Sequence, residues 1–268
     1  MFFFLPLYDD NPTGRTPIVT YALIGLCTII FLWQLGQNAD AVAYSYGMIP
    51  ARLFGSARLP SALAVVPPWA TIFTSMFLHS GWLHIGGNML FLWIFGNNIE
   101  DALGHIRYLL LYVLSGVAAA LCQALSDPAA TVPMLGASGA IAGVLGAYLL
   151  LYPYANVHVL VLIVFILRIV TVPAWILLGL WFAAQLLSGL LTKAGAPGGV
   201  AVWAHAGGFV TGIALLVLLR PHGLGLWRSP RTVAFATATP GAFAGRHTFH
   251  GSVPDSGPRR YRSPGPWG

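Results

Sequence analysis

Residues 138–154 read SGAIAGVLGAYLLLYPY, and residues 201–219 read AVWAHAGGFVTGIALLVLL. Neither stretch contains Asp, Glu, Lys or Arg, and each is close to the ~20 residues that an α-helix needs to cross a bilayer. Three further runs of this kind occur at residues 17–35, 85–99 and 108–125. Together these runs predict an all-α membrane protein.

The composition of the whole chain agrees with this fold class. Hydrophobic residues make up 57% of the 268 residues, charged residues only 7%, and the mean hydropathy is +0.76. A soluble domain carries about 25% charged residues, so this chain has too few to cover a water-facing surface. The net charge of +6 would suggest nucleic-acid binding in a soluble protein. Here we attribute it to basic residues on the cytoplasmic side of the membrane, and we expect no nucleic-acid partner.

The region 157–191 leaves the number of crossings open. It is almost uncharged and is long enough to cross once, at about 173–191 after a hydrophobic segment in or against the membrane, or twice as two short helices. The excess of basic residues in cytoplasmic loops favours six crossings with both chain ends in the cytoplasm, because seven would put the Arg-rich C-terminal end outside. The cytoplasmic side then has Arg15, Arg107 and that end, and the external side has Arg52, Arg58 and Lys193.

The predicted organisation has three parts. Residues 1–16 form a cytoplasmic segment, residues 17–220 a six-helix membrane domain, and residues 221–268 a disordered basic tail rich in Pro and Gly. Within the membrane domain, residues 36–81 carry many aromatic and large apolar side chains, so we expect short helices at the outer interface. The start MFFFLPLYDD has no basic residue before its short apolar run, and we expect no cleaved signal peptide.

Polar side chains in or beside the predicted spans are functional candidates, because burying them in a membrane is costly. The first cluster, HSGWLHIGGN at residues 79–88, leads into the second span. It includes His84 and Asn88, which are four residues apart and therefore on one helix face. The second cluster is GASG at residues 136–139, at the mouth of the fourth span. The third is AHAGG at residues 204–208, at the mouth of the sixth.

Ser138 and His205 are expected to meet. With six crossings, the fourth and sixth spans both begin on the external side, so the two side chains lie at a comparable depth. Small residues recur at every fourth position of both spans, and such stripes let helix backbones approach closely in lipid. The alternative is that the stripes only pack the helices and that Ser138 bonds to its own helix. The small residues are Gly139, Gly143 and Ala147 in the fourth span and Ala204, Gly208 and Gly212 in the sixth, with Gly136 assigned to the same packing.

The pair predicts nucleophilic catalysis. A neutral imidazole activates a serine hydroxyl by taking its proton. A carboxylate usually orients the histidine, but no Asp or Glu occurs between Asp127 and Asp255, so we expect a Ser138–His205 dyad. The oxyanion of the tetrahedral intermediate needs preorganised donors. The candidate donors are the Asn88 amide, the His84 imidazole and the backbone N–H of Ser138.

Other hydrolytic mechanisms do not fit this sequence. The stretch GASGA does not match GxSxG, no histidine is followed by Glu as HExxH requires, and no predicted span contains Asp. Cys27 and Cys122 fall in apolar runs without a CxxC pattern, so we expect buried thiols rather than a disulfide or a metal site. We therefore expect neither a metal nor a cofactor.

The same clusters resemble the bacterial rhomboid family of intramembrane serine proteases. The resemblance rests on TSMFLHSGWLHIGGNMLFLWIFGNNIEDALGHIRYLLLYVLSG at residues 74–116, GASGAIAGVLGAY at 136–148 and AHAGGFVTG at 204–212, and it covers most of residues 10–220. It implies a six-helix bundle around a water-filled cavity that opens to the outside. It also implies single-span membrane proteins as substrates, a lipid bilayer as surroundings and a location in the bacterial inner membrane.

The resemblance also implies a role for each residue of the clusters. Ser138 corresponds to the nucleophile, His205 to the base, His84 and Asn88 to the oxyanion pair, and His79 to an upstream histidine of the same region.

The sequence departs from some relatives in two respects. Ala142 stands where they carry an aromatic ring on which the histidine stacks, which leaves the orientation of His205 open. The Trp-Arg pair of their first loop is absent from that loop in this sequence.

Two other classes of function compete with the protease. A catalytically silent, rhomboid-like binder of membrane proteins is opposed by the presence of both Ser138 and His205. A small transporter is opposed by the lack of an inverted repeat and of acidic residues in the predicted spans.

Overall fold

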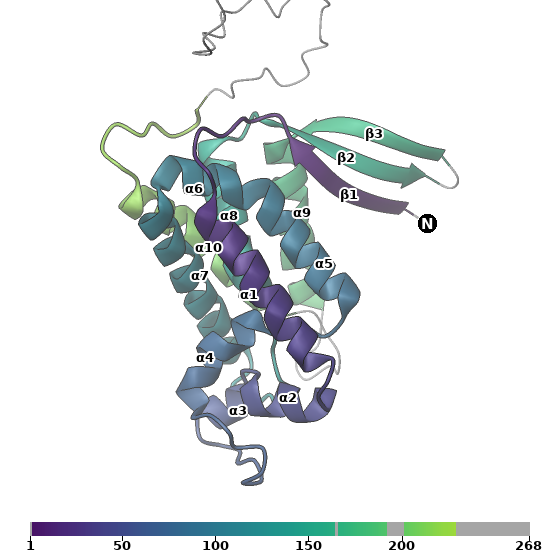
Figure 1. Ribbon diagram of the computed structural model, residues 1–268, viewed down its shortest axis with the longest axis vertical. Helices are drawn as coiled ribbons and strands as arrows, with labels where there is room; N and C mark the ends of the chain where they lie inside the picture. The colour runs from purple at the N-terminus through teal and green to yellow at the C-terminus, as the bar shows by residue number, and fades with distance from the viewer. Residues whose placement is uncertain (1, 164–165, 192–200, 229–268) are drawn as a thin grey trace, which may run out of the picture. The chain divides into compact units, whose positions relative to one another are not determined.

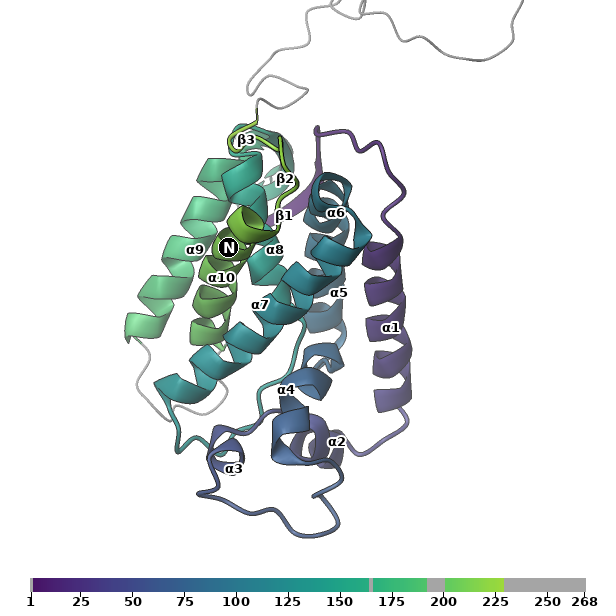
Figure 2. The same ribbon diagram turned by 90° about the vertical axis from the view of Figure 1, so that its left-hand side faces the viewer.

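The computed structural model describes residues 2–163, 166–191 and 201–228, which form a helical bundle and a small sheet (Figure 1). The helices of the bundle are α1 (Ile18–Gln34), α5 (Trp82–Phe91), α6 (Asn97–Leu103), α7 (His105–Ser126), α8 (Ser138–Leu151), α9 (Ala174–Leu191) and α10 (Val202–Leu219), and a π-helical turn, η3 (Leu92–Gly96), joins α5 to α6. Figure 2 shows α1 and α9 at opposite edges of this bundle.

The helices agree with the apolar runs of the sequence. Each of the five evident runs overlaps a helix, and the undecided region 157–191 contains one helix, α9, rather than two. By length and composition, α7, α9 and α10 can cross a membrane, while α1 and α8 are apolar but shorter, at 17 and 14 residues. The structure is mostly helical and contains helices that can cross a membrane, which agrees with the predicted class in its main feature. The count of six crossings and the side on which the termini lie stay predictions.

The prediction of an all-α fold is wrong in one respect, because three strands form an antiparallel sheet (Figure 1). The order is β1-β2-β3, so the N-terminal strand pairs with the hairpin that precedes α9. A continuous apolar run has the same pattern in a buried strand as in a membrane segment, so hydropathy alone does not distinguish them. The strands are β1 (Phe2–Asp9), β2 (Asn156–Ile163) and β3 (Ile166–Pro173).

The segment 36–81 contains the short helices that the sequence predicts, at the end of the bundle opposite to the sheet (Figures 1 and 2). Its position at a membrane interface stays a prediction. The Gln34 side chain, at the end of α1, fixes the following loop by bonding to both the backbone N–H and the backbone carbonyl of His79, at 3.0 and 3.2 Å. The short helices are α2 (Ala39–Tyr46), α3 (Pro50–Leu53), η1 (Pro68–Ala70), α4 (Thr71–Thr74) and η2 (Ser75–Phe77).

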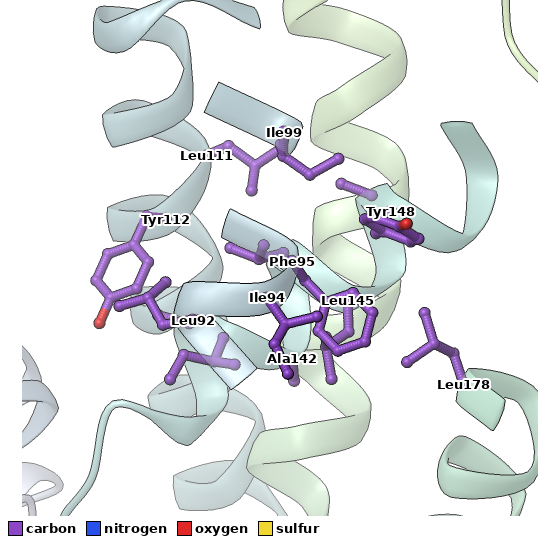
Figure 3. Packing of buried hydrophobic residues seen from close by; sticks show 14 of the residues in the cluster. Leu92, Ile94, Phe95, Ile99, Leu111, Tyr112, Ala142, Leu145, Tyr148 and Leu178 are labelled. Atoms are coloured by element: carbon purple, nitrogen blue, oxygen red, sulfur yellow. The ribbon is translucent and has the colours of Figure 1, made fainter. Parts of the chain in front are cut away.

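Helix α8 lies in the core, and nearly all of its residues are buried. The glycines of α8 and of α10 lie so close that the two backbones are in contact. A Cβ atom added to Gly208 would overlap the carbonyl oxygen of Gly139, and one added to Gly212 would overlap the backbone of Gly143. Large side chains from η3, α7, α8 and α9, such as Phe95, fill the space around this pair (Figure 3).

The start of the predicted disordered tail is ordered. Residues 221–228 form a turn against the end of α8, where the backbone N–H groups of Trp227 and Arg228 donate to the carbonyls of Leu150 and Leu151 at 3.2 and 2.8 Å. The rest of the predicted tail, from residue 229 on, lies outside the described residues, as does Lys193.

Candidate active site

Ser138 is the first residue of α8 and is half-buried. The turn before it is held in place by a hydrogen bond of 2.8 Å from the Gly136 N–H to the carbonyl of Ser75, and by backbone bonds between Met48 and Met134. The hydroxyl of Ser138 therefore lies at the N-terminal end of α8. Two separate segments of chain fix the turn that leads to it.

The structure gives Gly136 a role different from the helix packing that the sequence predicted for it. It lies two residues before α8 and has a φ of +127°, a backbone conformation that favours glycine. A Cβ atom at this position would lie only 2.8 Å from Cε1 and Nε2 of His84 and 3.6 Å from Oγ of Ser138. Glycine is thus required both by the turn and by the close approach of the His84 ring.

His205 lies in the first turn of α10, and only 8% of its surface is exposed. Its Nε2 atom is 2.8 Å from Oγ of Ser138, although 67 residues separate the two in the sequence. The glycine-to-glycine packing of α8 against α10 begins beside this contact, at Gly139 next to Ser138 and at Gly208 one turn after His205. The structure therefore brings together the two residues that the sequence singled out as nucleophile and base.

The other ring nitrogen of His205 has a partner that the sequence analysis missed. Oε1 of Gln185, in α9, lies 2.8 Å from Nδ1 of His205. A carbonyl oxygen can only accept a hydrogen bond, so this contact favours the tautomer with the proton on Nδ1, which leaves Nε2 as the acceptor for the Ser138 hydroxyl. An amide within a membrane span is itself a signal of function, and Gln185 could have been found by that criterion.

An aromatic ring lies beside His205, but it comes from α9 and not from position 142 of α8. Ala142 in α8 is fully buried. The ring of Trp181, in α9, lies with its centroid 5.7 Å from that of His205 at an interplanar angle of 40°. Helix α9 therefore places both a hydrogen-bond partner and an aromatic ring beside the imidazole.

The predicted oxyanion residues lie in α5. Nδ1 of His84 bonds to the hydroxyl of Ser80 at 3.0 Å, which leaves Nε2 directed toward Gly136. Asn88 is 8% exposed, and its Nδ2 atom has no hydrogen-bond partner among the described residues. Burial of an amide donor without a hydrogen-bond partner destabilises the folded protein. The Asn88 amide is thus available to donate to a bound ligand.

His79 packs against His84. Its ring is 2% exposed and meets the His84 ring edge to face, with 5.2 Å between the centroids. Burial, with a smaller effect of the neighbouring His84, lowers the pKa of His79 to about 4. His79 is therefore neutral near pH 7 and supports the His84 ring by packing.

The part of the chain that the structure describes brings no three His, Cys, Asp or Glu side chains together as a metal site. Cys27 is buried, Cys122 is half-buried, and both thiols are free.

Comparison with known proteins gives a family match. A model of the Rhomboid domain matches residues 67–222. Rhomboid protein 1, mitochondrial, of Saccharomyces cerevisiae is 33% identical over 144 residues, which cover 52% of this chain and 38% of that protein. Rhomboid protease GluP of Bacillus subtilis is 38% identical over 81 residues, 30% of this chain and 15% of that protein. RHOMBOID-like protein 1 of Arabidopsis thaliana is 35% identical over 159 residues, 56% of this chain and 35% of that protein. The matched regions span less than half the length of each of these relatives.

Proposed function

This chain belongs to the rhomboid family, and from that premise we propose that it is an intramembrane serine endopeptidase with Ser138 as nucleophile and His205 as base. The observation that carries the proposal is the distance of 2.8 Å between Nε2 of His205 and Oγ of Ser138, in a site where Oε1 of Gln185 lies 2.8 Å from the far nitrogen of the imidazole. The name of one relative from Bacillus subtilis, Rhomboid protease GluP, describes a protease and supports the same class of reaction.

The proposed reaction has two stages. Nε2 of His205 takes the hydroxyl proton of Ser138 while Oγ attacks the carbonyl carbon of the scissile peptide bond. The resulting imidazolium then gives this proton to the nitrogen of the leaving amine, and the C–N bond breaks to leave an acyl-enzyme. A water molecule, deprotonated by the same Nε2, hydrolyses the ester and returns the hydroxyl to Ser138.

Three donors are proposed for the oxyanion that forms in both steps. Nε2 of His84 lies beside Gly136, two residues before Ser138, the Asn88 amide is buried with a free donor, and the backbone N–H of Ser138 is at the N-terminus of α8. Because the first four N–H groups of a helix have no partner within it, the last of these donors is directed out of the helix end. Preorganised donors of this kind stabilise charge that develops only in the transition state.

The proposed substrates are single-span membrane proteins cut in or near the membrane. The proposed topology has six crossings, with the N-terminal segment and the basic C-terminal tail in the cytoplasm and residues 36–81 outside. The single helix in 157–191 supports an even number of crossings, and basic residues favour this orientation. A reporter fused after Arg220 should be cytoplasmic and one inserted at Lys193 external, and an external C-terminus would overturn the topology.

The proposed location is the inner membrane of a bacterium. The relatives include proteins named as mitochondrial and chloroplastic, so the family occurs in organelles as well. Expression of a tagged full-length chain, followed by separation of membranes, tests the proposal.

Covalent labelling tests the reaction class. The purified protein in detergent should react with a fluorophosphonate or an isocoumarin, and the label should map to Ser138. Activity on single-span substrates should be unaffected by a chelator. A loss of activity in EDTA that zinc reverses would overturn the serine mechanism. Binding of single-span proteins without labelling at Ser138 would instead identify a silent rhomboid-like binder.

A further inference from the structure

Helix α9, AWILLGLWFAAQLLSGLL, carries one amide, Gln185, and one hydroxyl, Ser188, in an otherwise apolar sequence. Gln185 lies on the face of α9 that meets α10, together with Leu178, Trp181 and Phe182, which recur at helical spacing on that face. The opposite face, which includes Leu180 and Leu187, is exposed and apolar. The one amide of the helix is therefore directed at the active site and away from the surroundings.

From this placement we propose that Gln185 is a positioning residue for the hydrolytic reaction, so that the site works as Ser138–His205–Gln185 rather than as an isolated pair. The proposal rests on the proposed function. Its geometric basis is the 2.8 Å contact from Nδ1 of His205 to Oε1 of Gln185, on the opposite side of the ring from the 2.8 Å contact to Ser138.

The tautomer of His205 decides whether it can act as a base. A neutral imidazole carries one proton, on either Nδ1 or Nε2. With the proton on Nε2, that nitrogen faces the Ser138 hydroxyl as a donor and cannot take its proton. An acceptor opposite Nδ1 holds the proton there and leaves the Nε2 lone pair free. A carboxylate performs this role in soluble serine proteases.

An amide suits this site better than a carboxylate because of where the site lies. An ionised side chain within a membrane span is costly, and no acidic residue occurs between Asp127 and Asp255. The Gln185 carbonyl selects the tautomer without adding a buried charge. It also restricts rotation of the ring, since its bond fixes one edge while the Trp181 ring borders one face.

A purely structural role for Gln185 can be separated from a positioning role, because the chain contains a matched amide. Oε1 of Gln123, in α7, accepts a hydrogen bond of 3.2 Å from the backbone N–H of Ala204, the residue before His205. Gln123 thus ties a neighbouring helix to the same turn of α10 through the backbone. Within the described part of the chain it makes no hydrogen bond to the imidazole, so its loss should affect helix association alone.

The experiment compares Gln185→Leu, Gln185→Glu and the control Gln123→Leu in the full-length protein, using kcat and KM on a single-span substrate and the rate of fluorophosphonate labelling at Ser138. We expect Gln185→Leu to lower kcat and the labelling rate about 10²-fold, the effect of misplacing a catalytic group by about 1 Å. KM should change little. Gln185→Glu retains an acceptor oxygen and should return both rates to within about tenfold of the wild type. Gln123→Leu should lower the melting temperature without lowering either rate per folded molecule.

Two results would overturn the proposal. One is a folded Gln185→Leu protein with wild-type kcat and labelling rate. The other is an equal loss of rate in Gln185→Leu and Gln185→Glu, which would show that the acceptor oxygen is not what matters. A wild-type protein that neither labels at Ser138 nor cleaves would remove the proposed function together with this role, and the two failures are thus distinguishable.

A measurement on the wild type covers the case in which Gln185→Leu does not fold. Nitrogen-15 NMR of the histidine-labelled protein reports which ring nitrogen carries the proton, and the His205→Ala protein identifies the signal. We expect the proton on Nδ1 near neutral pH, and a proton on Nε2 would overturn the proposal.

Discussion

Tyr148, near the C-terminal end of α8, donates a hydrogen bond of 2.5 Å to the Asp9 carboxyl in β1. The same carboxyl oxygen accepts a bond of 2.9 Å from Nδ2 of Asn98, in α6. Asp9 therefore joins the N-terminal strand to two helices, one of which carries Ser138 at its other end. The sheet that the sequence did not predict is thus linked to the core of the helical bundle.

The pH dependence of stability should reflect this contact. Burial raises the pKa of Asp9 to about 7, because its effect exceeds that of the stabilising bonds from Tyr148 and Asn98. Between about pH 4 and pH 7 the folded protein then binds more protons at Asp9 than the unfolded chain does, so stability falls as pH rises through this window. Melting temperatures measured in detergent at pH 5 and pH 8 should differ less in Asp9→Asn than in the wild type. The exposed control Asp40→Asn should keep the wild-type difference, and an unchanged difference in Asp9→Asn would contradict the assignment.

Asn88 should matter for the transition state more than for stability. If its free amide donates to the oxyanion, Asn88→Ala should lower kcat by roughly 10²–10³, with little change in KM because the bond strengthens only in the transition state. If Asn88 only holds helices together, the change should instead cost about 0.6–2 kcal/mol of stability and leave kcat per folded molecule intact. The matched control is Asn98→Ala in α6, which follows α5 and η3. The Asn98 amide bonds to Asn11 and Asp9, so this substitution should lower the melting temperature and leave kcat unchanged.

The ring of Trp181 should contribute a smaller effect on the rate. An aromatic contact contributes about 0.5–1.5 kcal/mol beyond area burial, so Trp181→Leu should lower kcat about 2- to 10-fold by loosening His205. The neighbouring Phe182 stacks on Phe209 with a centroid distance of 4.4 Å and provides the control. Phe182→Leu should reduce thermal stability with kcat unchanged. Equal losses of kcat in both variants would mean that α9 acts through general packing.

The glycine contacts between α8 and α10 should be needed for both folding and activity. Gly208→Ala places a methyl group against the Gly139 carbonyl. We expect a loss of about 1–3 kcal/mol from overpacking, and a loss of activity per folded molecule because the two helices hold Ser138 against His205. Gly179 in α9 has no atom within 4 Å of an added Cβ, so Gly179→Ala should be neutral or stabilising. A fully active Gly208→Ala protein would show that the site tolerates separation of these helices.

The meeting of Ser138 with His205 could be anticipated from sequence because it depends on two strong signals, long apolar runs and small residues at every fourth position. The β2–β3 hairpin could not, since its Val, Ile and Leu run has the hydropathy of a membrane segment. Strand β1 was missed for a related reason, because its pairing partner lies more than 140 residues away. Gln185 was a different kind of omission. An amide in a predicted span was a sufficient signal of a functional residue. Its partner, His205, depends on the packing of α9 against α10, which the sequence does not show.

The central claim is that Ser138 and His205 act as one catalytic unit, and a comparison of four proteins tests it most directly. Wild type, Ser138→Ala, His205→Ala and the double variant are reconstituted in lipid vesicles with a panel of single-span substrates, and turnover per folded molecule is measured. We expect cleavage by the wild type and a loss of roughly 10³-fold or more in each single variant. The double variant should be no worse than either, because groups that act as a unit are non-additive. Substantial turnover by a folded Ser138→Ala protein would contradict the account.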